Sequence, residues 1–141
     1  MKTYLEIAGI LQLSLSVAHI GFARHFGWRQ ELQNVSLFTR QVFWVHAGFL
    51  MLVLAGFGGV SLFWTNDLLS SNPLSKVILG GLAIFWAIRL FCQFFIYRTE
   101  LWRGHTFNTV MHFLFASLWI YLTTVYATAF CQAFVNNSPP L

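Results

Sequence analysis

The sequence has few charged residues: four acidic and eight basic side chains make up 9% of the chain, against roughly a quarter in soluble domains. With 57% hydrophobic residues, a soluble fold of 141 residues could not cover so much apolar surface. Hydrocarbon must therefore be the solvent, and the lipid bilayer is the first expected partner. The net charge of +4 comes from cations beside the hydrophobic runs. There they orient a membrane protein, so we expect no nucleic-acid partner.

Cysteine and the motifs of soluble enzymes are equally scarce. The two cysteines, Cys92 and Cys131, fall toward opposite membrane faces. A disulfide needs Cα atoms within about 7 Å of each other, so we expect two free thiols. The sequence has no glycine-rich phosphate loop and no serine-nucleophile motif.

Four apolar runs reach the roughly 20 residues that a helix needs to cross about 30 Å of hydrocarbon. They are residues 4–22, 42–64, 77–97 and 108–130. Backbone groups in lipid must bond within their own segment, so these runs predict helices. Glu6 and Gln12 interrupt the first run, and we expect a retained helix there in place of a signal peptide. The predicted fold class is an all-α integral membrane protein: a four-transmembrane-helix bundle with short loops, forming one domain over residues 1–141.

The cations lie unevenly about the predicted membrane. Three arginines fall in residues 23–41 and two in residues 98–107, whereas Lys2 and Lys76 fall on the other side. Positive residues are enriched in cytoplasmic loops. We therefore predict that residues 23–41 and 98–107 face the cytoplasm and that both termini lie on the opposite side.

A layer of polar side chains near the predicted cytoplasmic face is the main clue to function. Each run supplies one member, and the four are His19, His46, Gln93 and His112. Each lies about one turn from the end of its run, which places all four about 5–6 Å below one membrane surface. Polar side chains facing lipid are costly, so we expect this layer to face the interior.

Arg89 lies one turn deeper than Gln93 on the same predicted helix face. Burying an arginine in a membrane costs at least about 2.5–3.5 kcal/mol on insertion scales. No carboxylate is predicted at this depth. The expected partner is a histidine, a backbone carbonyl, water, or a ligand with an anionic or carbonyl group. Arg89 could equally be a structural clamp between helices.

Three kinds of ligand fit the layer. Haem b would take two of the three histidines as axial ligands, with its propionates held by Arg40, Arg103 and His105. Copper or zinc would be held by His19, His46 and His112, with Gln93, Gln41 or Asn108 accepting a hydrogen bond from a ring N–H. A quinone or lipid headgroup would bind the histidines, Gln93 and Arg89 without metal.

From the sequence we favour a small membrane redox protein that carries haem b or a metal in electron transport, with quinone as a candidate substrate. The alternatives are a lipid- or quinone-binding protein without metal, and a non-catalytic subunit or assembly factor of a larger membrane complex. In the subunit reading, the layer would only specify helix packing, and partner subunits would surround the chain. The sequence does not decide between an enzyme and a binding protein.

Overall fold

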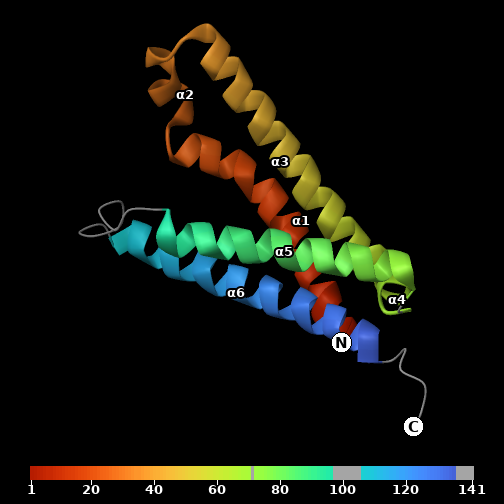
Figure 1. The fold of residues 1–141 in the computed structure, drawn as a ribbon. Helices are drawn as coiled ribbons and strands as arrows, with labels where there is room; N and C mark the ends of the chain where they lie inside the picture. The colour runs from red at the N-terminus through yellow and green to blue at the C-terminus, as the bar shows by residue number, and fades with distance from the viewer. Residues whose placement is uncertain (71, 97–105, 136–141) are drawn as a thin grey trace. The chain divides into compact units, whose positions relative to one another are not determined.

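The computed structural model describes residues 1–70, 72–96 and 106–135, which form helices and turns and no strand. Four of these helices are long and apolar enough to cross a membrane (Figure 1). They are α1 (Lys2–His25), α3 (Leu37–Phe63), α5 (Pro73–Phe95) and α6 (Thr106–Val135). The predicted class, an all-α multi-pass integral membrane protein with four spanning helices, is confirmed.

Three short elements lie in the connections. The helix α2 (Trp28–Glu31) and the 3₁₀ turn η1 (Leu32–Asn34) lie between α1 and α3, and α4 (Thr65–Leu68) follows α3. Gly27, between α1 and α2, has a left-handed φ of 62°. L side chains rarely adopt this conformation, so glycine permits the reversal that ends α1.

The helices begin at capping residues, and hydropathy alone did not locate these. The helix α3 begins at Leu37, not 42, because the Ser36 side chain accepts a hydrogen bond of 3.2 Å from the backbone N–H of Thr39. The helix α5 begins at Pro73, not 77, because Asn72 Oδ1 accepts a 2.8 Å bond from a backbone N–H in its first turn. Polar residues thus extend both helices beyond their apolar runs. Residue 97, the predicted end of the third run, lies outside the described residues.

The chain forms two compact units. The first consists of residues 1–5 with the chain from Thr65 onward, and the second of residues 6–64, so α1 contributes to both. Whether the two units form the single predicted domain depends on how they combine, so the single domain stays a prediction. The sidedness of the loops and termini also stays a prediction.

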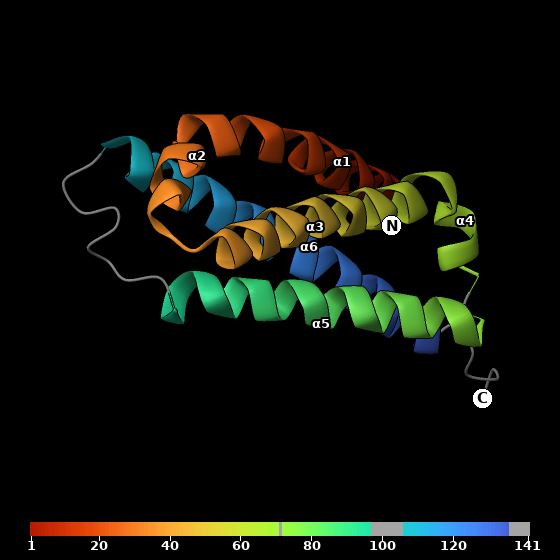
Figure 2. The ribbon, with the colours of Figure 1, turned by 90° about the horizontal axis from the view of Figure 1, so that it is seen from above.

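In the first unit, α5 and α6 run antiparallel and side by side (Figures 1 and 2). Large aromatic side chains fill the contact: Trp86 stacks on Trp119 with ring centroids 5.0 Å apart. Both rings are buried. Tyr121 of α6 donates a 3.0 Å hydrogen bond to the carbonyl of Tyr4, which ties residues 1–5 to this unit.

In the second unit, α1 and α3 approach most closely where two glycines meet. A Cβ on Gly9 or Gly58 would lie 2.8 Å from the carbonyl oxygen of the other glycine, so a side chain at either position would collide with backbone. Ser16 Oγ donates a 2.8 Å hydrogen bond to the carbonyl of Met51, about two turns farther along. Beyond it the two helices separate toward α2 (Figures 1 and 2).

Candidate functional site

The first unit holds a chain of hydrogen bonds through Gln93 of α5. Trp119 Nε1–H donates to Gln93 Oε1 over 3.3 Å. On its other side, Gln93 Nε2 lies 2.7 Å from His112 Nδ1. Gln93 and Trp119 are buried, so the structure brings two members of the predicted layer together inside this unit.

These hydrogen bonds determine which ring nitrogen of His112 carries the hydrogen. An indole nitrogen only donates, so the Gln93 oxygen faces Trp119 and the amide N–H must face His112. His112 Nδ1 is therefore the acceptor, and in the neutral ring Nε2 carries the proton. A neutral histidine binds a metal through the lone pair of one ring nitrogen. In His112 the Nδ1 lone pair accepts the bond from Gln93, and Nε2 carries the proton. Ligation of metal by His112 would thus require its bond with Gln93 to break.

Arg89 lies on the same side of α5. Its guanidinium carbon is 4.9 Å from the centroid of the Trp119 ring, within the range of a cation–π contact. The sequence predicted a histidine, carbonyl, water or ligand as the partner of Arg89, and an aromatic ring was not among these. The signal was present, because Trp119 follows His112 by seven residues on the same face of one helix.

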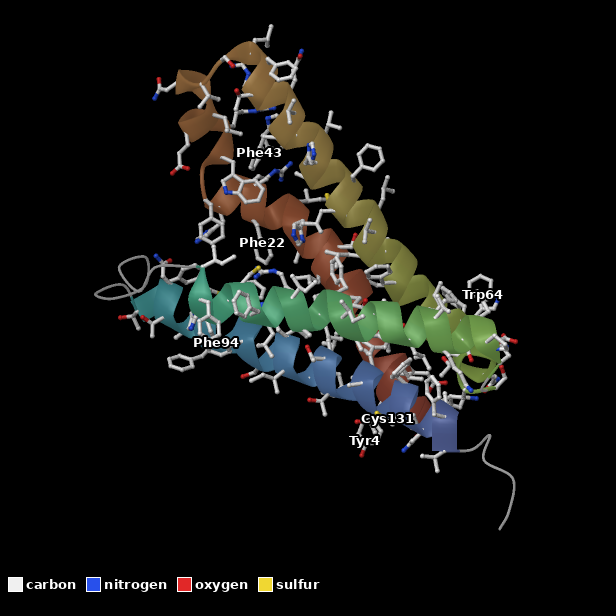
Figure 3. The ribbon with its side chains drawn as sticks, in the orientation of Figure 1. Tyr4, Phe22, Phe43, Trp64, Phe94 and Cys131 are labelled. Carbon is white, nitrogen blue, oxygen red and sulfur yellow. The ribbon has the colours of Figure 1, made fainter. Side chains whose placement is uncertain are left out.

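Aromatic rings close the sides of this cluster. Phe115 stacks on Trp119, with ring centroids 5.6 Å apart. Phe94 lies on α5 (Figure 3). The centroid of its ring is 6.1 Å from that of His112, and the two rings are nearly perpendicular. Gln93, His112 and Trp119 are therefore bonded to one another, and aromatic rings flank them.

The histidines of the second unit are bonded differently. His19 Nδ1 is 2.8 Å from the carbonyl of Leu15, and His46 Nδ1 is 2.8 Å from the carbonyl of Val42, each within its own helix. A carbonyl only accepts, so Nδ1 carries the hydrogen in both rings. In the neutral ring, Nε2 then has the lone pair that can accept a hydrogen bond or ligate a metal.

A cavity of about 530 Å³ lies in the second unit, where α1 and α3 separate. Its polar wall comes from the end of α1 and from α2, and consists of His19, Arg24, Arg29 and Gln30. Trp28 and Trp44 also line it. The ring centroids of Trp28 and Phe43 are 5.2 Å apart and the two rings are nearly perpendicular, a contact that packs α2 against α3. The volume lies within the roughly 300–1,000 Å³ typical of ligand pockets.

The predicted site residues thus have different positions. His19 lines the cavity, whereas His46 is exposed and does not line it. Arg40 lines a second, smaller cavity in the same unit. Arg103 and His105 lie outside the described residues. In the part of the chain that the structure describes, no group of three or more His, Cys, Asp or Glu residues lies close enough to hold a metal ion. Cys92 and Cys131 are free, as predicted.

Sequence reasoning missed the most important cavity residues. Arg24 and Arg29, two of the three arginines in residues 23–41, were interpreted only as orientation signals. The missed signal is Gly27, because a glycine between aromatic residues at a helix end allows the reversal that returns the following side chains toward α1. The close approach of Gly9 and Gly58, which leaves the cavity at the other end, has no distinct pattern in the sequence.

No family model, curated protein or solved structure matches this chain. The fold and the local geometry therefore carry the assignment. They define an all-α multi-pass integral membrane protein with a lined cavity in one of its two units.

Proposed function

We propose that this chain is a membrane binding protein for an amphiphile with an anionic headgroup, such as an acidic lipid. The observation that carries the proposal is the cavity between α1 and α3, in which Arg24, Arg29 and His19 line one side. Among the described residues, no carboxylate lines it. Guanidinium groups bind phosphate and carboxylate through paired hydrogen bonds, so the polar wall favours an anion.

The charges of the cavity wall are available for a ligand. In the described ranges, neither Arg24 nor Arg29 makes an ion pair or side-chain hydrogen bond. Glu31, the acidic residue of α2, does not line the cavity. Two positive groups with no carboxylate between them repel each other, and an anion removes that repulsion. A neutral quinone would not remove this repulsion, so we favour an acidic amphiphile over a quinone as the ligand.

The other wall suits the apolar part of such a ligand. The side of α3 that faces the cavity carries small and flexible groups, Ala47, Gly48 and Met51, beside Trp44. Small residues leave space, and methionine adapts to irregular apolar shapes. A ligand with a charged head and an apolar body matches both walls.

Haem b is the second candidate, and one observation favours it. The bond from His19 Nδ1 to a backbone carbonyl is the arrangement that orients many metal-ligating histidines, with Nε2 left to ligate. His19 would hold the iron, while Arg24 and Arg29 would hold the propionates. Bound haem would supply one-electron chemistry. The copper, zinc and partner-subunit readings gain no comparable observation and stay predictions.

One purification distinguishes the candidates. The protein is extracted in mild detergent, its optical spectrum is recorded, and bound molecules are identified by native mass spectrometry. We expect no Soret band and a retained acidic lipid that dioleoyl phosphatidylglycerol replaces. Dioleoyl phosphatidylcholine should replace it at least about tenfold less well, because its headgroup has no net charge.

Variants assign the binding to the cavity. Arg24→Gln combined with Arg29→Gln should abolish retention of the acidic lipid, whereas Lys76→Gln removes a charge in the other unit and should leave it unchanged. A stoichiometric Soret band that His19→Ala removes would replace the lipid proposal with the haem reading. Equal binding of both lipids would overturn the lipid proposal.

A further inference from the structure

A second cavity, of about 300 Å³, lies beside the first in the same unit. It is lined by Arg29, Gln33, Arg40, Gln41 and Trp44, from α2, η1 and the beginning of α3. In the part of the chain that the structure describes, the lining holds two guanidinium groups, two amides and an indole, and no carboxylate. Each of these side chains can donate a hydrogen bond, so this cavity also favours an anion.

Arg40 and Gln41 gain their positions from the capped start of α3. Ser36 caps the helix, so Arg40 and Gln41 lie in its first turns, near the positive end of the helix dipole. The dipole adds to the positive charge of Arg40 at this place. Arg40 is also half-buried, unlike the exposed Arg24 and Arg29, so water screens its charge less.

The two cavities share Arg29 and Trp44. Three guanidinium groups therefore follow one another: Arg24 in the first cavity, Arg29 at both, and Arg40 in the second. One phosphate monoanion would neutralise a single charge of the three. From this geometry we infer that the headgroup carries two phosphate groups, one in each cavity, with Arg29 between them. The inference deepens the proposed function and rests on it.

Two chemical sources supply such a headgroup. In a diphosphate ester the two phosphates share an oxygen, whereas in a bis-phosphatidyl lipid a short linker separates them. Both present at least two negative charges on an apolar body. The shared chemistry is a two-phosphate amphiphile, and matched probes separate the two sources.

The experiment measures binding of four probes to the detergent-solubilised full chain by native mass spectrometry. Farnesyl diphosphate is compared with farnesyl monophosphate, and tetraoleoyl cardiolipin with dioleoyl phosphatidylglycerol. We expect at least one two-phosphate probe to bind about tenfold or more tightly than its one-phosphate partner. A preference in the farnesyl pair alone assigns a diphosphate, and a preference in the lipid pair alone assigns separated phosphates.

Arg40→Gln provides the residue-level test. This variant should reduce the preference to about twofold, the statistical advantage of two equivalent phosphates, and leave one-phosphate binding unchanged. Arg24→Gln should weaken both members of a pair, and Lys76→Gln neither. Loss of one-phosphate binding in Arg40→Gln, or no preference in the unaltered chain, would overturn the inference while the proposed function stands. Failure of every probe to bind would overturn both.

Discussion

The two units treat their polar side chains in opposite ways. In the first, Gln93, His112 and Trp119 are bonded to one another and flanked by aromatic rings. In the second, His19 is bonded only to its own helix, and Arg24 and Arg29 line a cavity. Polar groups bonded to each other specify packing, whereas polar groups beside a cavity are available to a ligand. One sequence pattern, a histidine near the end of an apolar run, thus has two structural outcomes.

The largest expected effect is on stability, and it tests whether α1 and α3 are held by their glycine contact, in contrast to the aromatic contact between α5 and α6. Gly58→Ala should destabilise the protein by about 1–3 kcal/mol, because its Cβ would meet the Gly9 carbonyl at 2.8 Å and neither backbone can yield locally. Thermal unfolding in detergent measures the change. Gly56→Ala, two residues away, meets nothing within 4 Å and is the matched control. Equal stability of the two variants would show that the glycine contact is dispensable.

The next effect tests whether the hydrogen-bond chain of the first unit is structural. Gln93→Leu leaves the buried Trp119 N–H and His112 Nδ1 without their common partner, at a cost of about 1–2 kcal/mol. Denaturant unfolding in mixed micelles checks this value. Gln132→Leu, on the exposed surface of α6, should change stability by less than about 0.5 kcal/mol. Anionic-lipid retention should not change in either variant.

A pair of histidine variants sharpens the contrast directly. His112→Ala should lower stability by about 1 kcal/mol and leave lipid retention intact, since its ring serves the Gln93 chain. His19→Ala should weaken lipid retention severalfold and change stability less. Both properties are measured on the same preparations. If both variants lost only stability, the cavity would be a packing defect and the division between the units would fail.

The smallest expected effect concerns Arg89. A double-mutant cycle with Arg89→Leu and Trp119→Phe should give a coupling energy of about 0.5–1 kcal/mol, the usual size of a cation–π contact. Unfolding of the four proteins yields this energy. A cycle between Arg89→Leu and Trp64→Phe is the control, because Trp64 belongs to the other unit. A coupling near zero in the first cycle would remove Trp119 as the compensating group.

The fold class could be predicted because hydropathy over some twenty residues is a strong signal. The helix ends could not be predicted from hydropathy, since Ser36 and Asn72 set them through single hydrogen bonds. The placement of Gln93 and His112 in one layer was predicted from their equal depth, because depth along a helix scales with residue number, but their hydrogen bond to each other was not. Depth carries no information on which way a ring nitrogen is bonded. For that reason the structure alone showed that different ring nitrogens carry the hydrogen in His112 and His19.

The candidate cavity was less predictable than the polar layer. Its arginines lie in a connection, where their position depends on the left-handed turn at Gly27 and not on any helical period. Its opening depends on where α1 and α3 approach most closely, a property of two helices together. Sequence patterns within one helix cannot encode such a relation unless the partner face is known.

The contact between Gly9 and Gly58 also provides a pivot about which α1 and α3 can change their crossing angle. His19 lies ten residues from Gly9, and Gly48 ten residues from Gly58, so each arm from pivot to cavity is about 15 Å long. A change of only about 5° in the crossing angle would change the distance between the two arm ends by about 1.3 Å. A small change in bilayer thickness that alters the crossing angle would therefore change the width of the cavity. The hydrogen bond from Ser16 to Met51, which lies between this pivot and the cavity, resists such opening.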